Sequence, residues 1–225
     1  MTPITRRAGP EHLVLIIALC AVAALAVFAG LAAEVLEGDA FALDQVILLA
    51  FRDPHNLDLA LGPRWLQESA RDVTALGGFT VLSLVSVIAT LLLALHHRRR
   101  EALIFAATVI GAQAISAIAK IAIDRPRPIL VPHHDLVYAT SFPSGHALMT
   151  PVVYLTLATI IASSENRPAL KAVLPICATV VVLAVGISRV YLGVHWPTDV
   201  LAGWSLGLAI ALCASIALRR AHATT

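Results

Sequence analysis

The sequence predicts an all-α integral membrane protein, a bundle of six transmembrane helices that forms a single domain over residues 1–225. Two observations carry this prediction. Hydrophobic residues make up 59% of the chain and charged residues only 13%, whereas a soluble domain carries about 25% charged residues. The apolar residues also gather into long runs, and many of the Lys and Arg fall between them, which is typical of helices that cross a bilayer.

The first apolar run, residues 13–33, has 21 residues and no charge. As a helix it is roughly 30 Å long, which matches the hydrocarbon thickness of a bilayer. The apolar core of a cleaved signal peptide is shorter, about 7–15 residues, so we expect an uncleaved span. The fourth and fifth runs contain Pro151 and Pro175, which makes their ends the hardest to predict. The other five expected spans are residues 76–95, 102–119, 147–162, 172–187 and 200–218.

Basic residues beside the spans predict the orientation of the chain. Nine of the 16 Lys and Arg lie in short segments on one side, and the positive-inside rule makes that side cytoplasmic. An even number of spans then places both termini in the cytoplasm. The segments 34–72, 120–146 and 188–199 become extracytoplasmic. The nine residues are Arg6, Arg7, Arg98, Arg99, Arg100, Arg167, Lys171, Arg219 and Arg220.

The extracytoplasmic segment 34–72 contains an apolar stretch, Phe41–Phe51, of 11 residues. It is too short to span, so we expect a helix that lies on the membrane surface, with Trp65 as an anchor at headgroup level. This segment is either a plain connector or a guide for a substrate. Gly77 and Gly78, which follow it, are expected to be points of close helix packing.

Three short segments share the extracytoplasmic side, and they carry an unusual set of ionisable residues. They read KIAIDRPRP at 120–128, PSGH at 143–146 and SRVYLGVHWPTD at 188–199. Ionisable residues among apolar spans are expensive and therefore indicate function. Topology and motifs place the three segments on one face independently, which predicts a single site. Its candidate residues are Lys120, Arg127, Ser144, Gly145, His146, Arg189, His195 and Asp199.

This set of residues fits the hydrolysis of a phosphate ester, which needs neutralised oxygens, a nucleophile and a proton donor. Lys120, Arg127 and Arg189 can surround a phosphoryl group. Ser144 and Gly145 precede the fourth span, where backbone N–H groups can bind an anion. Singly, such residues are more often snorkelling cations or turn residues. Only their combination predicts a site.

His195 and Asp199 are four residues apart. If a helix begins near Pro197, the Asp199 carboxylate accepts a hydrogen bond from one nitrogen of His195. The other nitrogen is then free to attack, and the cation that forms is stabilised. His146 remains to protonate the leaving oxygen and then to activate the water that cleaves the phosphohistidine.

These segments resemble the signature of the type 2 phosphatidic acid phosphatase family, which is similar to class A acid phosphatases and vanadium haloperoxidases. The family pattern is Lys-x6-Arg-Pro, Pro-Ser-Gly-His and Ser-Arg-x5-His-x3-Asp, and the chain matches every position. The resemblance implies His195 as nucleophile, Asp199 as its orienting partner and His146 as general acid. Together with the six spans, it also implies a multi-pass protein of the bacterial inner membrane, where the distribution of basic residues places the active site on the periplasmic side. No metal and no cofactor are implied, and the sequence has no carboxylate cluster suited to magnesium.

Several polar residues lie outside this pattern. We expect Arg125 to pair with Asp124 or with a lipid phosphate rather than to touch substrate, and His133 and His134 to take no direct part in the chemistry. Three cysteines in separate apolar runs have neither metal-ligand spacing nor the pattern of a disulfide framework, and we expect them to be buried hydrophobes. They are Cys20, Cys177 and Cys213.

The sequence thus predicts metal-independent hydrolysis of a lipid phosphate or lipid pyrophosphate on the extracytoplasmic face. Membrane lipids are the expected partners, and a net charge of +2 gives no indication of nucleic acid. The motifs do not choose among undecaprenyl pyrophosphate, phosphatidylglycerol phosphate, phosphatidic acid and lipid A. The alternatives are phosphotransfer to a lipid or sugar, vanadate-dependent halide oxidation, and a lipid carrier or scaffold without catalysis. The intact His146, His195 and Asp199 argue against the last of these.

Overall fold

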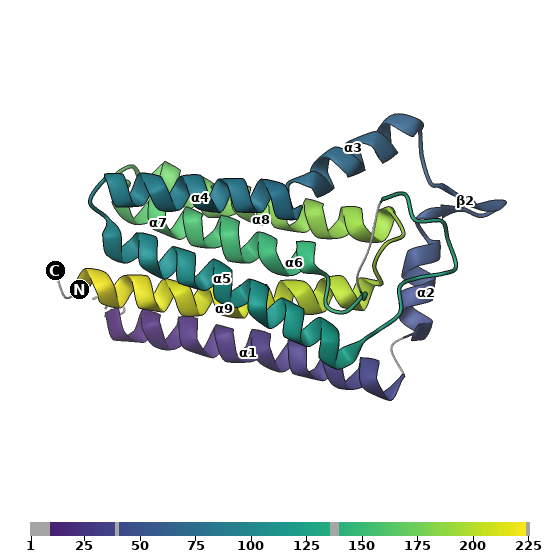
Figure 1. The fold of residues 1–225 in the computed structure, drawn as a ribbon, viewed down its shortest axis with the longest axis horizontal. Coiled ribbons are helices and arrows are strands. Elements are labelled where there is room, and N and C mark those ends of the chain that lie inside the picture. The colour runs from purple at the N-terminus through teal and green to yellow at the C-terminus, as the bar shows by residue number, and fades with distance from the viewer. Residues whose placement is uncertain (1–9, 39–40, 136–139, 224–225) are drawn as a thin grey trace, which may run out of the picture.

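The computed structural model describes residues 10–38, 41–135 and 140–223. They form an elongated bundle of long helices (Figure 1), which confirms the all-α membrane fold. The helices extend beyond the apolar runs of the sequence, and several of the candidate site residues lie near their ends. The bundle consists of α1 (Pro10–Glu37), α4 (Phe79–Leu95), α5 (Arg99–Ile123), α6 (Gly145–Thr150), the π-helical turn η1 (Pro151–Leu155), α7 (Thr156–Ser164), α8 (Pro168–Tyr191) and α9 (Pro197–Ala223).

Among the described residues, five helical segments are long and apolar enough to cross a membrane: α1, α5, α6 to α7, α8 and α9. A sixth span exists if α3 (Arg64–Ala75) and α4 are taken together, and these two are bent by 41°. The expected span at 76–95 therefore begins in a bend rather than in a helix. At that bend a Cβ on Gly77 would lie 2.6 Å from Val185 Cγ1 and 3.2 Å from His146 Cδ2. Gly77 is thus a close packing point, whereas a Cβ on Gly78 would meet only the backbone of Ala75.

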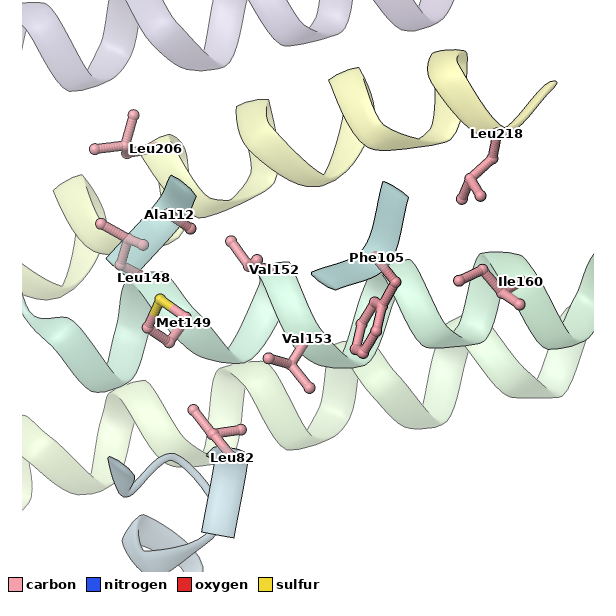
Figure 2. Packing of buried hydrophobic residues seen from close by; sticks show 10 residues of the cluster. All are labelled: Leu82, Phe105, Ala112, Leu148, Met149, Val152, Val153, Ile160, Leu206 and Leu218. Carbon is pink, nitrogen blue, oxygen red and sulfur yellow. The ribbon is translucent and has the colours of Figure 1, made fainter. Parts of the chain in front are cut away.

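The fourth span is continuous in spite of Pro151, because the helix widens into η1 where that residue has no N–H to donate. This span contributes much of the largest buried cluster, where Phe105 of α5 and Leu206 of α9 lie near Leu148 and Val152 (Figure 2). Outward-facing residues such as Ile110 are mostly exposed and apolar, as expected of a surface in contact with lipid. Cys20, Cys177 and Cys213 are also exposed. The expectation of buried cysteines was wrong, because an apolar residue of a membrane bundle can face lipid.

One end of the bundle carries the segment that precedes α4. Helix α2 (Phe41–Leu49) lies across this end (Figure 1), where a surface helix was expected. It is followed by an antiparallel pair of strands, β1 (Arg52–Asp53) and β2 (Asn56–Ala60), and then by α3. The hairpin and α3 were not predicted. The α1 helix begins and α9 ends at the opposite end of the bundle.

Candidate active site

The three segments meet at the α2 end of the bundle. Lys120 lies in the last turn of α5 and Arg189 in the last turn of α8. Ser144 immediately precedes α6, and its backbone N–H donates to the carbonyl of Asp199 at 3.0 Å. The ring of His195 lies within the electrostatic reach of Lys120, Arg127, His146 and Arg189. Residues far apart in the sequence thus come together, as the motifs predicted.

His195 is 2% exposed and has a different partner at each ring nitrogen. Nε2 lies 3.2 Å from Nη1 of Arg127, and Nδ1 lies 3.4 Å from Oδ2 of Asp199. Because a guanidinium can only donate, Nε2 is the nitrogen with the free electron pair, and the proton resides on Nδ1 facing the carboxylate. Burial, followed by the charge of Arg127, lowers the pKa of His195 well below its usual range. The ring is therefore held neutral, with Nε2 in the form that a nucleophile requires.

The Asp199 carboxylate is fully buried, and polar groups hold both of its oxygens. Oδ2 accepts from the backbone N–H of Trp196 at 2.8 Å and from the hydroxyl of Ser141. The contact with Trp196 is that of a capping box, in which the side chain of the third helical residue accepts from the backbone N–H of the residue that precedes the helix. Ser141 Oγ also lies 3.5 Å from Nδ1 of His195. Ser141 was not predicted, since nothing in its own segment distinguishes it.

Arg125 corrects the sequence prediction. Its side chain is buried, so lipid phosphate does not reach it. It forms ion pairs with Oδ1 of Asp199 and with Oδ2 of Asp44, both at 2.6 Å. The expected pairing with Asp124 or a lipid phosphate was wrong because α2, which carries Asp44, packs over this loop.

The three cations already donate to oxygens of the chain. Lys120 Nζ donates to the carbonyl of Thr140 at 2.8 Å, and Arg127 Nη1 to the carbonyl of Val194 at 2.5 Å. Arg189 Nη1 donates to Asp135 Oδ2 at 2.5 Å and to Thr74 Oγ1 at 3.0 Å. Burial, followed by the neighbouring charge of Arg189, lowers the pKa of Arg127 to about 10. Three positive charges thus act on the ring of His195, and that of Arg127 lies next to Nε2. Asp135 was not predicted as a partner of Arg189.

The start of α6 supplies the remaining candidates. Ser144 caps the helix, since its Oγ accepts from the backbone N–H of Ala147 at 3.4 Å. A Cβ on Gly145 would lie 3.9 Å from Cε of Lys120. The imidazole of His146 is half-buried and makes no hydrogen bond to any described residue. His146 is therefore placed beside the cations with both ring nitrogens available.

A cavity of about 710 Å³ leads from His146 and Lys120 along α4 and α5. Its walls are mainly apolar and include Phe79, Leu82 and Ile110. A larger cavity, about 910 Å³, lies near Glu11 and Lys171 and contains none of the candidate residues. Of these two cavities, the smaller joins an apolar passage to the cationic site.

The other outer-loop histidines bond to backbone. His133 Nε2 lies 2.7 Å from the carbonyl oxygen of Pro128. The backbone N–H of His134 donates to the carbonyl oxygen of Leu192 at 3.0 Å. Within the described ranges, no group of three or more His, Cys, Asp or Glu side chains is placed to hold a metal ion.

Comparisons with known proteins show which proteins this chain is similar to. Residues 101–222 match the PAP2 superfamily. Phosphatidylglycerophosphatase B of Bacillus subtilis is 36% identical over 149 residues, which cover 64% of this chain and 71% of that protein. Decaprenylphosphoryl-5-phosphoribose phosphatase of Mycobacterium tuberculosis is 33% identical over 136 residues, which cover 59% and 67% of the two chains.

A solved structure extends the similarity to most of the fold. The crystal structure of a transmembrane PAP2 type phosphatidylglycerolphosphate phosphatase from Bacillus subtilis matches with a TM-score of 0.74 and 30% identity. The match covers 86% of this chain and 93% of that one. The extent of the matched region, together with this shared fold, shows that the chain belongs to the PAP2 superfamily.

Proposed function

We propose that the protein is a lipid phosphatase that works through a phosphohistidine on Nε2 of His195. The observation that carries the proposal is the pair of contacts to His195, with Arg127 at Nε2 and the buried Asp199 at Nδ1. They leave the neutral ring with one reactive nitrogen, aimed at the place where three cations converge. The relatives are named as phosphatases of lipid-linked phosphates, which fits this chemistry.

In the first step, Nε2 of His195 attacks the phosphorus and the bond to the lipid oxygen breaks. His146 gives its proton to the leaving oxygen. Lys120, Arg127 and Arg189 neutralise the non-bridging oxygens, helped by the hydroxyl of Ser144 and the backbone N–H of Gly145.

In the second step, His146 takes a proton from water, and the resulting oxygen attacks the phosphorus. The phosphorus–nitrogen bond breaks and orthophosphate leaves, which restores neutral His195. Asp199 stabilises the His195 cation in the first step and its positive phosphohistidine in the second.

The apolar cavity beside His146 supports a lipid substrate. A chain of the substrate would lie between α4 and α5, in contact with residues such as Leu82 and Ile110, while its phosphate reaches Lys120. The names of the two relatives favour a phosphomonoester on a lipid, and phosphatidylglycerol phosphate is the first substrate to test. We assign the site to the extracytoplasmic face of the inner membrane because the basic residues lie beside the opposite ends of the spans.

Phosphate release by purified protein in detergent, with EDTA present, tests the proposal. The substrates are phosphatidylglycerol phosphate, phosphatidic acid, undecaprenyl pyrophosphate and lipid A. We expect release from at least one, and a loss of about 1000-fold or more in His195→Ala. The matched control is His55→Ala, which removes an exposed histidine at the same end of the bundle. Rapid quenching should capture a phosphoryl group that is labile in acid and stable in alkali.

Full activity in His195→Ala would contradict the nucleophile, and activity abolished by EDTA would contradict the metal-independent scheme. No release from any of the four lipids by folded protein would favour phosphotransfer, and the search would then turn to an acceptor.

A further inference from the structure

Helix α2 presents one polar group to the protein and an apolar face to its surroundings. Leu43 and Val46 are 64% and 67% exposed, whereas Asp44 and Leu48 are completely buried. The helix lies across the end of the bundle (Figure 1). A buried carboxylate is costly unless it is paired, so the partners of Asp44 show what this helix holds in place.

Asp44 bonds to the first turn of α9. Oδ1 accepts from the backbone N–H of Thr198 at 2.8 Å, and Oδ2 accepts from the hydroxyl of Thr198 at 2.6 Å. Thr198 precedes Asp199 directly. A negative charge at a helix N-terminus is favourable, because the first N–H groups of a helix have no partner within it. Asp44 therefore fixes the turn of backbone from which Asp199 projects.

Arg125 connects the same carboxylate to the active site. Nη2 donates to Asp44 Oδ2 and Nη1 to Asp199 Oδ1, both at 2.6 Å, and Nη1 also donates to Thr198 Oγ1 at 2.7 Å. Arg125 is 3% exposed, and the carbon of its guanidinium lies 5.5 Å from the ring centre of Trp196. Because the guanidinium is planar and rigid, it fixes the two carboxylates relative to each other.

The orientation of Asp199 matters because its contact with His195 is long. Oδ1 is held by Arg125, which turns Oδ2 toward Nδ1 of His195 at 3.4 Å. A small rotation of the carboxylate would lengthen this contact beyond a hydrogen bond. The nucleophile would then lose the partner that fixes its tautomer and stabilises its cation.

We propose that Asp44 and Arg125 are positioning residues for the nucleophile. They hold Asp199 in the rotation that serves His195, and they make this alignment depend on the docking of α2. The inference rests on the proposed function of His195. It goes beyond anchoring, because an anchor alone would affect the stability of the fold and not the chemical step.

Asp44→Asn tests this directly, since it keeps the shape of the side chain and removes its charge. The matched control is Asp58→Asn, the same change at an exposed position of β2. We expect kcat for the best lipid substrate to fall about 10- to 100-fold in Asp44→Asn, as for other small misplacements of a catalytic group. KM should stay within about two-fold, because the phosphate ligands are untouched.

Two inhibitors separate positioning from general damage. Orthovanadate takes the five-coordinate geometry of the transition state on a histidine nitrogen, whereas inorganic phosphate binds as the product does. We expect the inhibition constant for vanadate to rise with the loss of kcat and that for phosphate to stay within about two-fold. The ratio of the two constants does not depend on the fraction of folded protein.

The inference would be overturned if both inhibitors bound to Asp44→Asn more weakly by the same factor. It would also be overturned if the inhibition constant for vanadate were the same in Asp44→Asn and Asp58→Asn. If Asp44→Asn does not fold, the ratio of the vanadate and phosphate inhibition constants is measured in Arg125→Lys instead. Lysine keeps the positive charge but lacks the planar guanidinium that joins the two carboxylates. A wild-type protein that neither releases phosphate nor binds vanadate would overturn the proposed function itself. An active wild type with unaffected variants would overturn only the positioning role.

Discussion

At the scale of single residues, the environment of His195 decides its protonation. The ring is buried, and the nearby charges are cationic. Both effects disfavour the imidazolium, so the pKa of His195 lies below that of a free histidine, about 6.5. In the proposed mechanism, the free enzyme therefore holds the nucleophile ready at neutral pH. A bound phosphate dianion acts in the opposite direction and supports the cation that forms during attack.

The pH profile of kcat/KM checks this. The two-histidine scheme predicts a bell. Its acidic limb should lie below pH 6.5, because on that side activity is lost when His195 gains a proton, and its basic limb reports the loss of the proton from His146. The limb of kcat, which reports the substrate complex, should lie at higher pH than that of kcat/KM. Rates from pH 4.5 to 9 should be corrected for the second ionisation of the phosphate itself, near pH 6. An acidic limb of kcat/KM above pH 7 would contradict the assignment.

The residues of the site were predictable only where a motif holds them. His146, His195 and the three cations follow from residue types at fixed spacing. Asp44, which bonds to Thr198, comes from a segment 154 residues away. Ser141 and Asp135 are 58 and 54 residues from Asp199 and Arg189. Single polar residues in loops carry no periodic signal, and only the packing of the fold brings them into the site.

At the scale of elements, close contact between α9 and α6 sets the position of His146. A Cβ on Gly207 of α9 would lie 2.3 Å from the carbonyl oxygen of Leu148 and 2.5 Å from Cγ of Pro151. Backbone atoms cannot yield as a flexible side chain does. Small residues allow helices in a membrane to approach closely and pack well. The approach of these two helices therefore requires glycine at this position.

Gly207→Ala should lower the stability of the protein by about 1–3 kcal/mol, the usual result of overpacking. The control is Gly30→Ala in α1, where a Cβ would meet nothing within 4 Å and alanine is the better helix former. Thermal unfolding in detergent should show a lower transition temperature for the first variant only. Equal transition temperatures for the two variants would mean that α6 and α9 can move apart freely.

Elements were predictable where hydrophobicity marks them. Long apolar runs indicated the spans, and the motif residues mark where α5 and α8 end. The β1 strand has two residues and β2 five, which is too short for a clear alternating pattern. The α3 helix contains many polar residues and buries only Thr74. Its packing against α8, and not its composition, makes it part of the bundle.

At the scale of the whole molecule, the candidate site lies at one end of the bundle, and a group of basic residues that do not belong to this site lies at the other. One end carries α2 and the candidate site. At the other end, where α1 begins and α9 ends (Figure 1), Lys171, Arg219 and Arg220 line the larger cavity. This separation is what the positive-inside rule requires if the site faces away from the cytoplasm.

Reporter fusions test this orientation. Green fluorescent protein at the C-terminus should fluoresce, and alkaline phosphatase at the same position should be inactive. Alkaline phosphatase inserted in the exposed turn between β1 and β2, at His55, should be active. The reverse pattern would place the site in the cytoplasm and would limit the substrates to lipids of the inner leaflet.

The oxygens that occupy the site cations have a consequence for turnover. Thr140, Val194 and Asp135 each accept a hydrogen bond from one of the three cations. In the proposed reaction, part of the attraction of an arriving phosphate would be offset wherever it replaces one of these bonds. When orthophosphate departs, the same oxygens return to the cations. A pocket of bare buried charges would retain its product and stall, whereas in the proposed reaction these oxygens would compete with the product for the cations and so favour its release.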